Sequence, residues 1–336
     1  MNEQMLDPRV ELADLHIHVG AAVAPHILWS IAHDQGFKLP VSTYWEFRDL
    51  VTAGPEKVSS LGDYLAILHQ WTEKIQSSPA AIERSIYEII GKEFRSSNVS
   101  LIELRFNPMK RNLGGERDLD HIIHAALRGM DRACLEYGVR AGLIFCLARE
   151  FSLELNEILV KKAVKYRSRG VIGIDLAGPE MHTLELGEYV DGYRALFQRA
   201  RHAGLGTTVH TGETTYTAAP GVLAVLEKLS PSRIGHGIAA ARSEEALRKL
   251  VEAGTILEIC PSSNLRTHAV ADLVELGSAL HTFERAGVRF TINTDGPYLL
   301  NTHLRHEYDL LSRAGILTDA QIDRTIATAR AATFIR

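Results

Sequence analysis

Histidine is the residue type with the clearest chemical meaning in this sequence. The chain of 336 residues contains 15 histidines, and imidazole suits metal binding and proton transfer better than it suits packing. His16 and His18 alternate within an apolar run, so in an extended strand both rings point to one side and can converge on one ion. His210 and Asp295 end two further apolar runs. Together these four residues suit catalytic Zn²⁺, with Fe²⁺, Mn²⁺ and Co²⁺ as alternatives.

Two further residues are candidates for proton transfer beside this metal set. Glu213 stands three residues after His210, and His236 lies in the tight sequence Ile-Gly-His-Gly. Each has an ordinary structural explanation, because helix dipoles favour acids at helix starts and a histidine can be a satisfied core residue. In combination with the metal ligands, however, we predict catalytic roles for Glu213, His236 and Asp295.

The secondary-structure elements that must position these residues alternate regularly along the chain. Short apolar, β-branched runs alternate with helix-like stretches, several of which end in glycine just before the next run. Eight such runs predict strands, at residues 10–18, 99–108, 140–149, 171–180, 206–213, 233–238, 255–264 and 289–297. Eight strands alternating with helices indicate the α/β class and a (β/α)₈ TIM barrel, whose active site forms at the carboxyl ends of its strands.

An open doubly wound sheet is the rival architecture. It would usually show a Gly-x-Gly-x-x-Gly fingerprint after its first strand, and here that strand runs into HIHVGAAV instead. The connection at residues 19–98 is longer than the others and mostly helical in pattern. In a barrel it would lie over the catalytic mouth as a lid or pocket wall. We therefore interpret residues 1–336 as one catalytic barrel domain with a helical insert at 19–98.

Composition excludes several other classes of protein. The chain has 41 acidic and 37 basic residues, a net charge of −4, and 46% hydrophobic residues. This balance gives no basic face for nucleic acid. Residues 15–33 lack Asp, Glu, Lys and Arg, but their four histidines, Gly20 and Pro25 argue against a membrane span. Three cysteines without a CxxC pair, and no signal-like N-terminus, favour a cytoplasmic protein; homo-oligomer formation is left open.

Six motifs together resemble one known family. DLHIH, GIDLAGPE, TVHTGE, RIGHG, LEICPSSN and NTDGP occur in the order and approximate spacing of the adenosine deaminase family of the amidohydrolase superfamily, from about residue 10 to about residue 310. The resemblance implies a (β/α)₈ barrel with one divalent metal, usually zinc. It also implies an aminohydrolase that releases ammonia from a small heterocyclic amine, such as a purine-like compound or nucleoside derivative.

The resemblance also implies a role for each site residue. His16, His18, His210 and Asp295 match the metal ligands. Glu213 then matches the residue that protonates the purine ring nitrogen beside the reacting carbon, and His236 matches the residue that orients and deprotonates the attacking water. Gly178 matches the glycine whose backbone amide contacts the purine. We expect Gly178, Gly296 and His18 to border the substrate.

Two departures from the family pattern affect substrate contacts and leave the metal ligands intact. Where the family usually reads His-Leu-Asp-Gly, this chain has His-Val-Gly-Ala at 18–21, and where it reads Asp-Asp-Pro, this chain has Asp-Gly-Pro at 295–297. The missing carboxylates bind the ribose 5′-hydroxyl and an imidazole nitrogen of the purine in relatives. Thr211 and Pro179 are smaller departures in the same direction. We therefore expect intact metal chemistry but poor turnover of adenosine itself.

Two alternative functions stay open at this point. One is another metal-dependent amidohydrolase that cleaves a cyclic amide or ester, although the lysine that bridges two metals in binuclear members is absent from the end of the fourth predicted strand. The other is a catalytically silent barrel that binds a metabolite. Glu213 and His236 argue against the silent barrel, because a binding protein would not need them.

Overall fold

The computed structural model describes residues 6–54, 56–180 and 189–336. Its centre is a sheet of eight parallel strands in the order β1 to β8, each paired with the next along the chain. The strands are β1 Leu12–His18, β2 Val99–Phe106, β3 Arg140–Ala148, β4 Val171–Ala177, β5 Gly206–Thr211, β6 Arg233–His236, β7 Ile256–Ile259 and β8 Phe290–Ile292. The predicted α/β barrel class is therefore confirmed.

A short contact after β8 brings the two edges of the sheet together. Ile17 and Asp295 form an isolated parallel bridge. The amide of His18 donates to the carbonyl of Asp295 at 2.7 Å, and the amide of Asp295 donates to the carbonyl of His16 at 2.8 Å. This bridge closes the barrel at its carboxyl end, so the same hydrogen bonds that complete the fold also place Asp295 beside the two β1 histidines.

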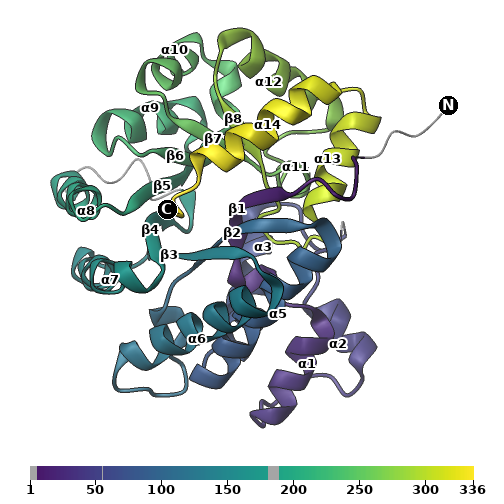
Figure 1. Cartoon of the computed structure of the whole chain (residues 1–336), viewed down its shortest axis with the longest axis vertical. Coiled ribbons are helices and arrows are strands. Elements are labelled where there is room, and N and C mark those ends of the chain that lie inside the picture. The colour runs from purple at the N-terminus through teal and green to yellow at the C-terminus, as the bar shows by residue number, and fades with distance from the viewer. Residues whose placement is uncertain (1–5, 55, 181–188) are drawn as a thin grey trace.

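Helices surround the barrel (Figure 1). They are α6 Leu119–Tyr137, α7 Leu153–Lys165, α8 Val190–His202, α9 Ala218–Lys228, α10 Glu244–Ala253, α11 Pro261–Arg266, α12 Leu273–Ala286, α13 Leu304–Arg313 and α14 Asp319–Ala332. Their ends follow local rules: α10 begins where the Ser243 side chain accepts from the amide of Ala246 and ends at Gly254 with φ 65°. Among the described residues, no helix is both long and apolar enough to cross a membrane.

All eight predicted strands are longer than those of the structure, and the difference is largest for the last two. The seventh was expected over 255–264, but β7 ends at Ile259 and α11 begins at Pro261. Proline at the first position of a helix loses no hydrogen bond and has a suitable φ, so it ends the strand and starts the helix. The eighth was expected over 289–297, but β8 ends at Ile292 because Asp295 turns into the left-handed region, with φ 62°.

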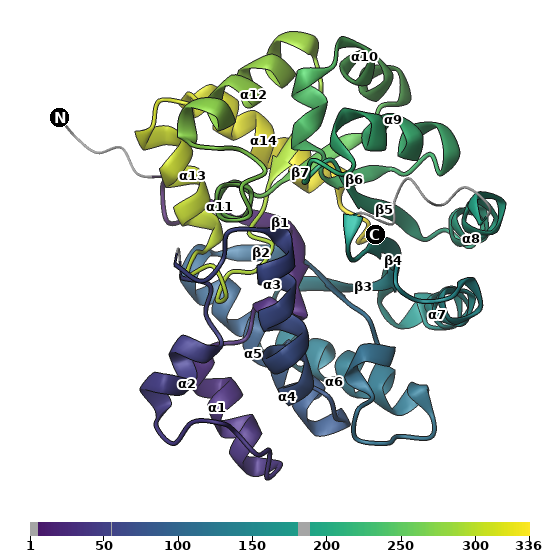
Figure 2. The ribbon, with the colours of Figure 1, turned by 180° about the vertical axis from the view of Figure 1, so that it is seen from behind.

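The segment between β1 and β2 is helical. It contains the turn η1 Val19–Ala21, the helices α1 Pro25–Asp34, α2 Tyr44–Leu50, α3 Leu61–Ile67, α4 Glu73–Ile75 and α5 Pro79–Ser97, and the π-turn η2 Leu68–Thr72. Figure 2 shows α3 in front of β1 and β2, with α4 below it and α1 and α2 farther from the barrel. The insert thus has two parts, of which the part around α3 lies against the strand ends.

Candidate active site

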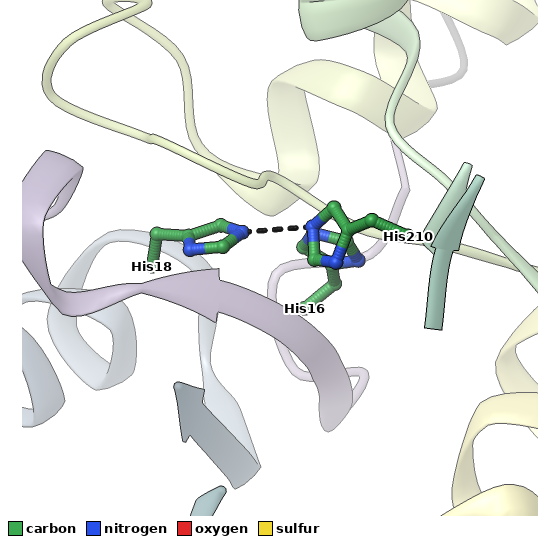
Figure 3. A group of neighbouring side chains, drawn as sticks. All are labelled: His16, His18 and His210. Carbon is green, nitrogen blue, oxygen red and sulfur yellow. Dashed lines mark hydrogen bonds between the residues drawn. The ribbon is translucent and has the colours of Figure 1, made fainter. Parts of the chain in front are cut away.

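Three histidine side chains converge at the carboxyl ends of β1 and β5. His16 and His18 come from β1 and His210 comes from β5, and one possible ligand atom of each lies within 4.8 Å of the others. The Nε2 atoms of His18 and His210 are 3.0 Å apart (Figure 3). His16 is fully buried and His18 is the most exposed of the three. The predicted ligand set is therefore brought together from residues 192 positions apart.

Asp295 adds a carboxylate to the same group. Its Oδ1 lies 3.5 Å from Nε2 of His18 and 3.9 Å from Nε2 of His16. Ser263, at the start of α11, donates its hydroxyl to the other oxygen at 2.6 Å. Asp295 and His236 both have left-handed backbones, with φ of 62° and 59°. Strain of this kind in residues other than glycine is typical of functional positions.

Two buried carboxylates fix the orientation of the β1 and β5 imidazoles. His16 donates from Nδ1 to Glu258 at 2.8 Å, and His210 donates from Nδ1 to Asp175 at 3.1 Å. A ring that donates from Nδ1 keeps a lone pair on Nε2. Within the described part of the chain, the buried Nε2 of His16 has no hydrogen-bond partner. This donor set fits one divalent metal ion, because carboxylate–histidine pairs are the usual outer support of such sites.

Burial also favours the neutral, metal-binding form of these rings. It lowers the pKa of His16 and of His18 well below the usual value, and the positive charge of Arg105 adds to the effect. A second group that could hold a metal is His16, His236 and Cys260. Burial raises the pKa of the Cys260 thiol well above its usual value, so this sulfur is a poorer ligand than an imidazole. The three-histidine group is the better site.

The supporting carboxylates belong to a buried ion-pair network inside the barrel. Arg105 donates to Asp175 at 3.0 Å and to Glu258 at 2.8 Å. Arg233 donates from Nε to Glu258 at 2.6 Å and also pairs with Glu103. All five side chains are at most 1% exposed. The positions of His16 and His210 are therefore linked through Arg105.

Glu213 and His236 face each other beside the histidines. Oε2 of Glu213 lies 3.5 Å from Nε2 of His236, and both residues are buried. Burial, with the nearby negative charges of Glu180 and Asp295, raises the pKa of Glu213 well above its usual value. Burial lowers the pKa of His236 well below its usual value. Burial thus favours the protonated form of the Glu213 carboxyl group and the neutral form of the His236 imidazole, which suits an acid and base pair.

Residues of the loops after β4 and β7 hold these two side chains. Thr267 donates its hydroxyl to Glu213 at 3.1 Å, and the amide of Asn264 contacts Nδ1 of His236 at 3.0 Å. When the Asn264 oxygen faces the ring, Nδ1 carries the hydrogen and Nε2 is free to accept a proton. Glu180 accepts from the amides of Glu213 and Thr214, at 3.1 and 2.7 Å, and so orders the turn after β5.

The three predicted substrate contacts occupy different surroundings. His18 and Gly178 line one small cavity, and Gly178 has φ 105°, a conformation that favours glycine. Gly296 instead packs closely against α3. A side chain at this position would overlap the Tyr64 hydroxyl of α3 and approach Ala21. Among the residues described, Gly296 is not part of that cavity lining. Its contact with the substrate remains a prediction.

Sequence reasoning missed the supporting residues. Asp175, Glu258, Asn264 and Ser263 all lie inside the recognised motifs GIDLAGPE and LEICPSSN. A charged residue within a buried strand is a signal that could have singled out the two acids, because buried carboxylates need partners.

A closed (β/α)₈ barrel with imidazoles and carboxylates gathered at its strand ends defines a metal-dependent amidohydrolase. Comparison with known proteins places this barrel in one family. The adenosine deaminase family description matches residues 11–336. An adenosine deaminase of Shewanella denitrificans is 29% identical over 318 residues, covering 95% of this chain and 92% of the relative. The chain belongs to the adenosine deaminase family, and it is a hydrolase that releases ammonia from a purine-like compound.

Solved structures share the fold at lower identity. An adenine deaminase of Arthrobacter aurescens has a TM-score of 0.83 at 20% identity, covering 97% of this chain and 94% of that one. An N6-mAMP deaminase of Arabidopsis has a TM-score of 0.81 at 22% identity, covering 98% and 95%. A zinc-bound amidohydrolase of Burkholderia ambifaria has a TM-score of 0.83 at 19% identity, covering 98% and 87%. At these identities the likeness establishes the fold.

Proposed function

We propose that this chain deaminates a purine-like heterocycle at the buried histidine site, and that adenosine is a poor substrate. The observation that carries the proposal is the pairing of Glu213 and His236, 3.5 Å apart, next to the three histidines and Asp295. A barrel that only bound a metabolite would not need a protonated carboxyl group and a neutral imidazole at its metal site.

The proposed metal is one Zn²⁺ ion, held by His16, His18, His210 and Asp295. Three imidazoles and a carboxylate match the ligands that zinc prefers at catalytic sites, and a solved structural neighbour is a zinc-bound amidohydrolase. Zinc at such a site acts as a Lewis acid that makes water nucleophilic near neutral pH.

Two side chains then carry the proton transfers, and a third orients the water. His236 accepts a proton from the attacking water, and the Asp295 carboxylate orients that water. Glu213 donates its proton to the ring nitrogen beside the amine-bearing carbon, so that no negative charge builds up on the ring. The water oxygen bonds to that carbon, the bond between the carbon and the amine nitrogen breaks, and the proton on His236 leaves with the amine as ammonia. The remaining hydroxyl proton returns to Glu213. Burial of all three side chains keeps bulk water from competing for these protons.

The substrate preference follows from carboxylates that this chain lacks. Glycines occupy positions 20 and 296, where the family usually has aspartates that bind the nucleoside. The relatives are named for a nucleoside, a free base and a nucleotide, so their names leave the preferred compound open. We also propose that the insert at 19–98 covers the mouth of the site, because its Tyr64 packs against Gly296.

An ammonia-release panel tests this function. Zinc-loaded protein is incubated with aminopurines, aminopterins and modified nucleosides, and adenosine is expected to be among the weaker substrates. Glu213→Gln should lower the turnover number by about 10²- to 10⁴-fold while zinc content stays at one per chain. The matched control is Glu227→Gln on α9. Full activity in Glu213→Gln would refute its role, and zinc-bound wild type that releases no ammonia from any compound would favour the binding protein.

A further inference from the structure

A small cavity beside His18 is lined by side chains that the proposed reaction does not use. Its volume is about 60 Å³, and its lining includes Glu73 of α4 together with Asn107, Lys110 and Arg111. The last two residues belong to the 3-10 turn η3 Met109–Arg111, which follows β2. The cavity therefore lies between the helical insert and the end of the second strand.

Several buried donors in this lining, among them Nδ2 of Asn107 and Nε of Arg111, have no acceptor among the described residues. Asn107 is 4% exposed, and its side-chain oxygen accepts from the amides of Met109 and Lys110 at 2.8 and 3.2 Å. This fixes the amide so that Nδ2 points away from the turn, where it has no partner. Arg111 is 1% exposed, and its Nε also has no partner. Buried donors without acceptors are costly, so this cavity is suited to a ligand that accepts hydrogen bonds.

The charges of the lining favour an anion over a neutral acceptor. The described lining contains three cations, Arg105, Lys110 and Arg111, and the carboxylate of Glu73. Arg105 is already paired twice inside the barrel. Arg111 lies 2.8 Å from Glu73. Burial works to raise the pKa of Glu73, but the charge of Arg111 together with the hydrogen bond and charge of His69 lowers it. Among the described residues, Lys110 pairs with the partly exposed Glu150, an interaction that solvent weakens. The cavity thus retains positive charge.

Glycine at position 20 allows Arg111 to reach this place. A side chain at Gly20 would begin 3.1 Å from Nη2 of Arg111 and 3.1 Å from Cγ of Glu73, which is closer than most real contacts. The guanidinium therefore fills the space beside the backbone just after His18. Glycine at position 20, where the family usually has aspartate, therefore both removes a carboxylate and makes room for the Arg111 guanidinium.

We propose that this cavity is an oxyanion subsite, and that the substrate carries a carboxylate or phosphate which accepts from Arg111 and Asn107. A volume of about 60 Å³ is room for about two water molecules, which suits such a group and excludes a ring. The heterocycle then lies on the other side of His18, toward Glu213. This inference rests on the proposed deaminase function and specifies its substrate class.

The test compares three 6-aminopurine probes on zinc-loaded protein: adenosine, AMP and adenosine 5′-carboxylate. In wild type, at least one anionic probe should have a kcat/KM about tenfold or more above that of adenosine. Arg111→Gln should lower this ratio about tenfold or more, through a loss of kcat/KM for the anionic probe that exceeds any loss for adenosine. Arg324→Gln is the matched control, because Arg324 is 58% exposed and likewise pairs with a glutamate. The better anionic probe identifies the anion as phosphate or carboxylate.

A second variant, Asn107→Asp, tests the subsite independently in case Arg111→Gln does not fold. Asn107→Asp keeps an oxygen for the amides of Met109 and Lys110 but replaces the free donor with a negative charge, so the anion preference should fall about tenfold or more. Equal efficiency of all three probes in wild type, or an unchanged ratio in both variants, would overturn the subsite. If none of the three probes releases ammonia, the wider ammonia-release panel decides the deaminase function separately, and calorimetry decides the subsite. At least one of AMP and adenosine 5′-carboxylate should then bind wild type more tightly than adenosine, and equal binding of all three would overturn the subsite.

Discussion

Replacing Glu258 with glutamine should weaken both the fold and the proposed zinc site. Its two carboxylate oxygens accept from four buried donors. Oε2 accepts from Nδ1 of His16 and Nη2 of Arg105, each at 2.8 Å. Oε1 accepts from Nε of Arg233 at 2.6 Å and from the hydroxyl of Thr208 at 3.3 Å. Glutamine has only one side-chain oxygen, so either orientation turns an NH₂ group toward a pair of donors.

The expected magnitude follows from burial. Glu258, Arg105 and Arg233 are at most 1% exposed, and removing one partner of a buried ion pair costs about 3–5 kcal/mol. This is a large part of the typical ~5–15 kcal/mol that separates folded from unfolded protein. Loss of the carboxylate behind a metal-binding histidine should also lower zinc affinity about 10- to 100-fold.

Two measurements on Glu258→Gln separate these effects. Urea unfolding of the metal-free protein gives the stability change, and competition with a chromophoric chelator gives the zinc affinity of the folded protein. Glu252→Gln is the matched control, because Glu252 is about half-exposed and pairs with Arg248 and Lys249 on the surface of α10. It should cost at most about 1 kcal/mol. A Glu258→Gln protein with the stability and zinc affinity of the control would refute the reasoning.

Three further outcomes are expected. Zinc at 100 times its dissociation constant should raise the free energy of unfolding by about 2.7 kcal/mol, and a chelator should reverse this in a denaturant titration. Gly206→Ala should cost about 1–3 kcal/mol, because its side chain would overlap the Phe334 ring, and Phe334→Ala in the same chain should recover part of that loss. Asp120→Asn should lower stability at neutral pH but not near pH 2. Burial works to raise the pKa of Asp120, but hydrogen bonds from Lys162 and Lys165 prevail and lower it from 3.8 to about 2. The stabilisation is therefore complete above pH 4 and lost as the pH falls toward 2, and unfolding curves at both pH values check it.

The sequence predicted most of the fold because the signals are local. Each strand is a short apolar run, and glycines such as Gly138 and Gly254 end the preceding helices in the left-handed conformation. Those patterns depend on residues a few positions apart, which is the range over which strand and helix periodicity acts. The ends of β7 and β8 were less well predicted, because a proline in one case and a left-handed Asp295 in the other end the extended backbone before the predicted limit.

The sequence by itself determined which side chains are available for chemistry: the His-x-His pair, His210, Glu213, His236 and Asp295. Their motif order was enough to suggest the family. Alternation along one strand already placed His16 and His18 on the same side, because that relation is local.

Only the tertiary structure decided what surrounds those side chains. Arg105 meets Asp175 and Glu258 across 70 and 153 residues of chain, and no local pattern specifies such a pair. The same holds for the insert, whose Glu73 reaches Arg111 beside Gly20. Closure of the barrel brings these distant segments into one buried volume, where low solvent access sets the charge states of Glu213 and His236.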